Sequence, residues 1–155
     1  MTQNDVELLT KKILDTIERE REREIISRRY GLYDRKETLE QIGELLGITR
    51  ERVRQLEKAT VTRLRVNAEA GEMPELSEFE TVLEAKLKEL GNIARISKLS
   101  DELTEQESSK IDQARLSFIG ELCPSLSVIT DNDHFFQSIA ITAIHDEKKV
   151  ASYVN

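Results

Sequence analysis

Hydrophobic residues recur at three- and four-residue steps along the first 65 positions, which is the pattern of amphipathic helices. Val6, Leu9 and Ile13 form one such stripe, and Ile25 and Ile26 mark the inward side of a second. The pattern predicts four helices, over residues 5–16, 19–30, 38–46 and 49–65. We therefore expect the first part of the chain to be a four-helix unit.

The third and fourth expected helices meet at Gly47 and have the layout of a helix-turn-helix. Glycine adopts the turn conformation that residues with side chains resist. Thr49 is a good N-cap for the fourth helix, because its hydroxyl can accept from a backbone N–H of the first turn. Two apolar stripes are expected to face inward, namely Leu39, Ile42, Leu45 and Leu46, and then Val53, Leu56, Thr60 and Leu64. In this motif the second helix enters the major groove of DNA.

The outward face of the fourth expected helix carries side chains of the types that read DNA. The residues expected to face the bases are Arg50, Glu51, Arg54 and Gln55. An Arg fork matches the two acceptors on guanine, Gln matches adenine, and Glu can accept from cytosine. Arg52 and Lys58 are expected to hold phosphates, which positions a protein without reading sequence. The alternative for any one of them is a solvated charged face with internal ion pairs. The combined pattern favours DNA recognition.

Beyond residue 66 the pattern breaks and starts again. Gly71 and Pro74 interrupt the helical pattern at mid-chain, and such residues are typical of turns and loops. We therefore predict a first domain at residues 1–67, a linker at 68–75 and a second domain at 76–155.

In the second part, helical spacing gives way to strand-like alternation. Helices are expected over 76–90, 96–103 and 105–122, and strands over 125–130 and 136–141. Ser77 is a plausible N-cap for the first of these helices, and residues 131–133 read as a hairpin turn. Ile93 is expected to pair briefly as a strand residue. Three helices followed by a β-hairpin is the order of a winged helix.

The predicted fold class is thus mainly α, with a small α+β winged-helix-like domain after the helix-turn-helix domain. The last stretch, 142–155, is expected to be a short helix or the point at which a longer natural chain has been cut.

Residues 21–65 carry several linked motifs in one order: RYGL, then TLEQIG, then TRERVRQLE. In these motifs the segment closely resembles region 4 of primary bacterial sigma factors. The preceding VELLTKKILDTIE also looks like the first helix of that region, so the resemblance covers roughly residues 5 to 66. A generic helix-turn-helix would not share RYGL or TRERVRQ.

The resemblance implies a function. In that family the domain reads the promoter −35 element with the second helix of the motif, and it docks on the flap tip of the RNA polymerase β subunit. By position, Arg50, Glu51, Arg54 and Gln55 match the family's base-facing residues. The positions that match its contacts with the DNA backbone are Arg21, Arg29, Thr38, Leu39 and Glu40. No region 2, the part that melts the −10 element, is visible, so the chain is not a complete sigma factor.

Charge argues against DNA binding for the chain as a whole but not for this segment. The 155 residues carry a net charge of −7. Residues 1–70 hold 15 Lys and Arg against 14 Asp and Glu, a net of +1, and residues 71–155 hold 8 against 16, a net of −8. Within residues 19–65 the count is 13 against 9, a net of +4. We expect the acidic second half to bind protein, or to point away from DNA.

The remaining features restrict the function further. The sequence shows no Gly-rich phosphate loop, nucleophile elbow or metal-ligand cluster, so we expect no enzymatic role, no cofactor and no metal site. No run of about 18 apolar residues suits a membrane span, and the single Cys123 fits a reducing, cytoplasmic location.

Two functions therefore remain open. The first is a sequence-specific DNA-binding transcription regulator that reads a −35-like element in double-stranded DNA, with or without polymerase. The second is a protein–protein adaptor that uses the sigma-like fold to contact RNA polymerase or another assembly, without autonomous DNA binding.

Overall fold

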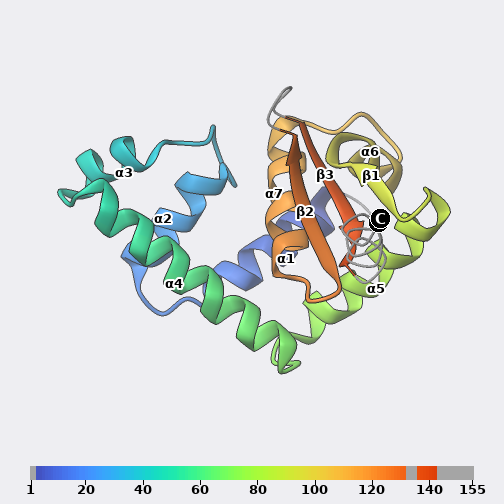
Figure 1. Ribbon diagram of the computed structural model, residues 1–155, viewed down its shortest axis with the longest axis horizontal. Coiled ribbons are helices and arrows are strands. Elements are labelled where there is room, and N and C mark those ends of the chain that lie inside the picture. The colour runs from blue at the N-terminus through green and yellow to red at the C-terminus, as the bar shows by residue number, and fades with distance from the viewer. Residues whose placement is uncertain (1–2, 132–135, 143–155) are drawn as a thin grey trace, which may run out of the picture.

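The computed structural model describes residues 3–131 and 136–142, and these form seven helices and a three-stranded sheet (Figure 1). The helices are α1 (Gln3–Asp15), α2 (Glu20–Tyr30), α3 (Leu39–Leu46), α4 (Arg50–Glu69), α5 (Pro74–Glu89), α6 (Ile96–Thr104) and α7 (Lys110–Leu122). The strands are β1 (Ile93–Arg95), β2 (Leu126–Asp131) and β3 (Phe136–Ile141). The mainly helical fold class predicted from the hydrophobic pattern is confirmed.

The ends of the N-terminal helices are set by residues that the sequence marks. Gly31 and Gly47 end α2 and α3 in the left-handed conformation, at φ 69° and 71°. Thr49 caps α4 as predicted, because its side chain accepts from the N–H of Arg52. Thr38 caps α3 in a reciprocal capping box with Gln41, which satisfies two N–H groups at once.

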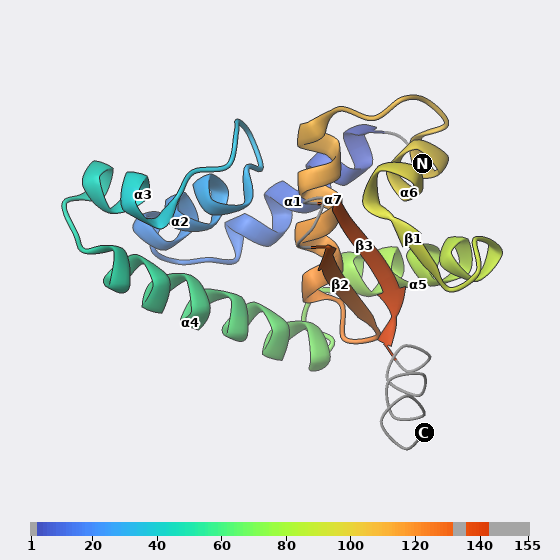
Figure 2. The same cartoon turned by 45° about the horizontal axis from the view of Figure 1, so that its top comes forward.

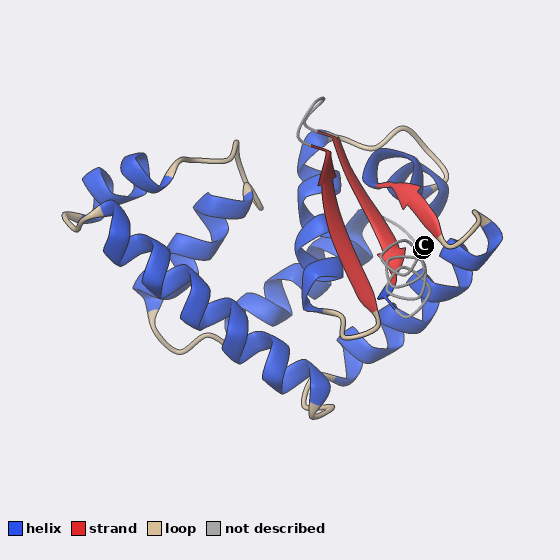
Figure 3. Cartoon of the chain, viewed as in Figure 1, coloured by secondary structure: helices blue, strands red, loops and turns tan. Residues whose placement is uncertain are grey.

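The sheet is entirely antiparallel, in the order β1-β3-β2. Ile139 at the centre of β3 is paired with Val128 on one side and Ala94 on the other. Strand β1, which contains Ile93, confirms the brief strand pairing predicted there. Figure 3 shows the sheet beside α7, with α2 and α3 at the opposite end of the molecule. Three helices and a strand pair thus follow one another in the winged-helix order. The predicted turn at 131–133 and the stretch after 142 lie, wholly or in part, outside the described residues.

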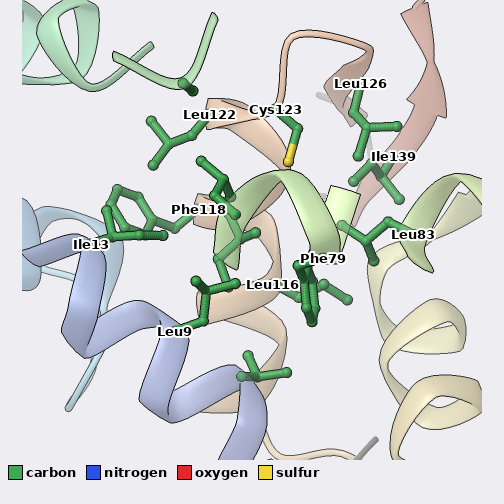
Figure 4. Close-up of a cluster of buried hydrophobic side chains, with 14 of the residues drawn as sticks. Leu9, Ile13, Phe79, Leu83, Leu116, Phe118, Leu122, Cys123, Leu126 and Ile139 are labelled. Atoms are coloured by element: carbon green, nitrogen blue, oxygen red, sulfur yellow. The ribbon is translucent and has the colours of Figure 1, made fainter. Parts of the chain in front are cut away.

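Two hydrophobic cores support the molecule. The smaller lies between α2 and the helix-turn-helix, where Ile25, Ile42 and Val53 are fully buried. The larger draws on helices from both halves of the chain and on the sheet, as Figure 4 shows. In it Leu9 and Ile13 of α1 lie in one cluster with Leu116 and Phe118 of α7, since α1 and α7 pack against each other. The larger core therefore joins the first helix of the sequence to the second half.

Helix boundaries in the second half differ from the predicted ones. Helix α4 runs on to Glu69, and α5 begins earlier than expected with Pro74 in its first turn, where the missing N–H of proline costs nothing. Ser77 is therefore not an N-cap, and its hydroxyl instead donates to the Met73 carbonyl. The prediction that this serine caps the helix is wrong.

The expected helix over 105–122 is shorter in the structure. Glu105 has φ 57°, a conformation that a helix interior excludes. Helix α7 begins instead after Ser109, which forms a capping box with Asp112. Leu45, which was predicted to face inward, is 54% exposed.

The division of the chain into two domains stays a prediction. Hydrophobic packing is continuous across the expected linker at 68–75, since Ala68 and Met73 are both buried in the larger core.

Candidate nucleic-acid interface

The helix-turn-helix is held at a fixed angle by close packing at its turn. Ile42 of α3 and Val53 of α4 have no exposed surface. Gly43 allows this approach, because a side chain on it would place its first carbon 2.7 Å from the Ile48 carbonyl oxygen. Helices α3 and α4 therefore meet backbone to backbone, at the end of the molecule farthest from the sheet (Figure 1).

The four residues predicted to face DNA bases all lie on the exposed side of the N-terminal half of α4. They are Arg50, Glu51, Arg54 and Gln55. Figure 2 shows this half of α4 along the outer edge of the molecule, next to α3. The surface is thus open to a large partner, and the four side chains fall on one patch of it.

These side chains bind one another in the protein by itself. Arg54 donates to both carboxylate oxygens of Glu51, at 2.6 and 3.0 Å, and Arg50 donates to Glu40 at 3.0 Å. The hydrogen bond from Arg54 lowers the pKa of Glu51 and keeps that carboxylate charged. Exposed ion pairs contribute little, about 0–1 kcal/mol, so the side chains can exchange these partners for others.

Residues at the start of α3 are arranged as a phosphate contact would require. Thr38 uses its hydroxyl to accept from the Gln41 N–H, which leaves the N–H groups of Leu39 and Glu40 in the first turn, where a helix supplies no acceptor. Such N–H groups are a ready site for an anion. Arg52 and Lys58 of α4 and Arg21 of α2 are also exposed. Their roles toward the DNA backbone stay predictions.

Arg29 is placed differently from the other predicted backbone contacts. Its guanidinium lies 3.4 Å from the Glu57 carboxylate and donates to the Glu37 carbonyl. It therefore ties α2 to α4 and to the loop before α3. Burial raises the pKa of Glu57, although the charge of Arg29 pulls it down. This pair could not be predicted from the sequence, because residues 28 positions apart carry no local signal of contact.

The second half holds the RYGL segment through polar contacts that local sequence patterns also do not predict. Arg115 is buried and donates from Nε to the Leu32 carbonyl at 2.8 Å. The hydroxyl of Tyr30 donates to the Glu121 carboxylate at 2.8 Å. Arg65 near the end of α4 donates to the Glu121 carbonyl. Helix α7 is thus the element against which the helix-turn-helix unit rests.

The described residues contain no group of three or more His, Cys, Asp or Glu side chains arranged to hold a metal ion. Among the same residues, no helix is long and apolar enough to cross a membrane.

Comparison with known proteins confirms the resemblance over part of the chain. Residues 19–66 match the family described as Sigma-70, region 4, a DNA-binding helix-turn-helix that contacts the −35 element and is not an enzyme. The chain is 56% identical over 46 residues to the RNA polymerase principal sigma factor HrdC of Streptomyces coelicolor. It is 47% identical over 55 residues to the RNA polymerase sigma factor SigA of Nostoc sp., and 48% over 54 residues to that of Microcystis aeruginosa.

The match to HrdC covers 29% of this chain and 14% of HrdC. The match to SigA of Nostoc sp. covers 35% of this chain and 14% of that protein, and the match to SigA of Microcystis aeruginosa covers 34% and 13%. The chain therefore spans only about a seventh of the length of these relatives. The matched segments hold the helix-turn-helix, and the second half of the chain lies outside them.

Proposed function

We propose that this chain is a sequence-specific DNA-binding transcription regulator that reads a −35-like element through the N-terminal half of α4. One observation carries the proposal: the four side chains at the base-facing positions lie together and exposed on one face of α4, within the segment that matches Sigma-70, region 4. Each is of a type that recognises base edges.

The mechanism follows from the pairs seen in the free protein. On entering the major groove, Arg54 would turn its guanidinium fork from Glu51 to a guanine, leaving Glu51 to accept from cytosine. Arg50 would exchange Glu40 for a base or a phosphate. Because these pairs are exposed and weak, the exchange requires little energy.

The backbone of the duplex would be held beside α3. The N–H groups of Leu39 and Glu40 would donate to one phosphate, and Thr38 would lie next to it. Arg21, Arg52 and Lys58 would neutralise neighbouring phosphates, which fixes the position of the protein without reading sequence. Arg29 would first have to leave Glu57 to do the same.

We further propose that the chain acts in the cytoplasm and meets RNA polymerase, at the flap of its β subunit, while bound to DNA. The relatives are named as RNA polymerase sigma factors, which supports polymerase as the partner. The net charge of +4 over residues 19–65 is small, so we expect a modest affinity for DNA. Contact with polymerase would add to that affinity.

A fluorescence-anisotropy titration tests the proposal directly. A −35-type duplex and a scrambled duplex of the same composition are titrated at two salt concentrations. We expect tighter binding to the −35-type duplex at both, with affinity for each duplex falling as salt rises. Equal affinity for the two duplexes would contradict sequence-specific recognition.

A second candidate, the adaptor without autonomous DNA binding, is favoured by the charge of the second half. Residues 71–155 carry a net of −8, which suits a basic protein partner better than DNA. Affinity purification with nuclease treatment separates the two. An adaptor would retain polymerase or another partner after the nucleic acid is removed, and would bind neither duplex in the titration.

A further inference from the structure

A cavity of about 750 Å³ lies between the loop that follows α2 and the N-terminal ends of α6 and α7. Both cartoon views place that loop beside the N-terminal end of α7 (Figures 1 and 2). The ends of β2 and β3 complete the wall through Thr130 and Gln137. The cavity is therefore built by both halves of the chain, and none of the predicted DNA-contacting residues lines it.

The charge of this cavity is opposite to that of the chain. Arg35, Lys36, Arg95 and Lys110 line it, with Asp34 as the acidic residue of the lining. Asp34 already accepts from the Arg35 N–H. Two of the four cations, Arg95 and Lys110, come from the half that carries a net of −8. Within the described residues, neither Lys36 nor Lys110 has a carboxylate within 4.0 Å.

The walls between these cations are apolar. Ile96, Ile111 and Ala114 contribute hydrocarbon surface. Gly31 lets the loop fold back tightly, since it has φ 69° and a side chain on it would lie 2.8 Å from Cγ of Lys36. Apolar walls with a few placed polar groups and a volume of several hundred Å³ are typical of small-molecule sites.

We propose that this cavity binds a small organic anion, with a carboxylate, sulfonate or phosphate group held by Lys36 and Lys110 and an apolar body held against Ile96 and Ile111. A duplex backbone fits less well, because its phosphates lie on a convex, strongly hydrated surface and have no use for an apolar wall. The proposal does not depend on recognition of a −35 element.

A second cavity supplies an internal control. It has about 720 Å³ and lies between α1 and α2, with two acidic residues, Glu7 and Asp15, against two basic ones, Lys11 and Arg23. A probe that enters any apolar hollow would occupy both cavities. A probe held by charge would prefer the first.

The experiment uses 1-anilinonaphthalene-8-sulfonate as the anionic probe and N-phenyl-1-naphthylamine as its neutral counterpart. Fluorescence titrations are run on the full chain, on Lys36→Gln/Lys110→Gln, and on the matched control Lys11→Gln/Lys12→Gln. We expect the sulfonate to bind at least about tenfold more weakly to the first variant, because hydrogen bonds to charged groups are strong. The affinity of the sulfonate for the control variant should stay within about twofold of its affinity for the wild-type chain. The neutral probe should bind all three proteins with affinities within about twofold of one another. Circular dichroism checks that each variant is folded.

Methyl NMR places the probe. The Ile96 and Ile111 signals should shift on addition of the sulfonate, and that of Ile17 should not. Equal sulfonate affinity for the two double variants would overturn the proposal, as would shifts that spare Ile96 and Ile111. It would also be overturned if Lys36→Gln/Lys110→Gln weakened binding to a long duplex while leaving sulfonate binding unchanged, because the lysines would then serve the DNA backbone.

Discussion

The helix-turn-helix unit and the second half of the chain are stabilised in different ways. The helix-turn-helix shares with α2 a core of three fully buried residues, Ile25, Ile42 and Val53, and displays charged side chains on its outer face. The second half shares a large core with α1 and surrounds Phe118, which has no exposed surface. The surface proposed to read DNA is therefore carried by a small unit that rests on a larger body. The difference teaches that the large core and the proposed DNA-reading surface occupy separate parts of this molecule.

Phe118→Ala should have the largest effect on this arrangement. The Phe118 ring lies 5.0 Å from that of Tyr30, so it belongs to the large core and also touches the RYGL segment. Its removal should lower the free energy of unfolding by about 3–5 kcal/mol, as measured by urea denaturation. Leu45→Ala is the control, because Leu45 is 54% exposed, and it should change stability by less than about 0.5 kcal/mol. A small effect at Phe118 would mean that the large core does not hold the molecule together.

Arg115→Met should weaken the junction between the two regions without emptying the core. The methionine keeps the apolar stem but leaves the Leu32 carbonyl without its donor. An unsatisfied buried acceptor costs about 1–3 kcal/mol, again measured by urea denaturation. Arg50→Met removes a guanidinium whose ion pair with Glu40 is exposed on both sides, and it should cost less than about 1 kcal/mol. Equal losses for the two variants would show that Arg115 is not a specific link.

Arg54→Ala should act on recognition and leave stability nearly unchanged. It should reduce the preference for a −35-type duplex over a scrambled one by about 1–3 kcal/mol. Lys58→Ala, on the same exposed face, should weaken both duplexes alike. Anisotropy titrations of both variants against both duplexes give the comparison. Equal loss on the two duplexes for Arg54→Ala would remove it from the base-reading set.

The helix-turn-helix was predictable in detail because its signals are local. Thr49 and Gly47 determine the backbone around them through hydrogen bonds and φ angles within a few residues. The inward positions of Val53, Thr60 and Leu64 follow from helical spacing alone. Local rules of this kind need no knowledge of the rest of the fold.

Contacts between distant segments were not predictable in this way. Nothing in the sequence near Leu32 indicates that Arg115, 83 positions later, donates to its carbonyl. The docking of α1 on α7 was likewise not predictable. An amphipathic stripe indicates that one face of a helix is buried, but it does not indicate which element that face packs against. The basic cavity was not predictable for the same reason, since Lys36 and Lys110 line one cavity only in the folded chain.

Glu57→Gln should have the smallest effect, and one that depends on pH. Burial raises the pKa of Glu57 above its ordinary value of 4.5, against the pull of Arg29. At a pH between the ordinary and the raised pKa, Glu57 keeps its proton in the folded protein but has lost it in the unfolded chain. The stability that this proton contributes to the folded protein is lost as the pH rises through the folded pKa. The glutamine variant has no such loss. Its stability relative to the wild type should therefore increase between pH 4 and pH 7, by less than about 1 kcal/mol because the site is partly exposed. Urea denaturation at both pH values measures the difference. If the difference in stability between the variant and the wild type did not change with pH, Glu57 would have the same pKa in the folded and unfolded states. Burial beside Arg29 would then not disfavour the charged form of Glu57.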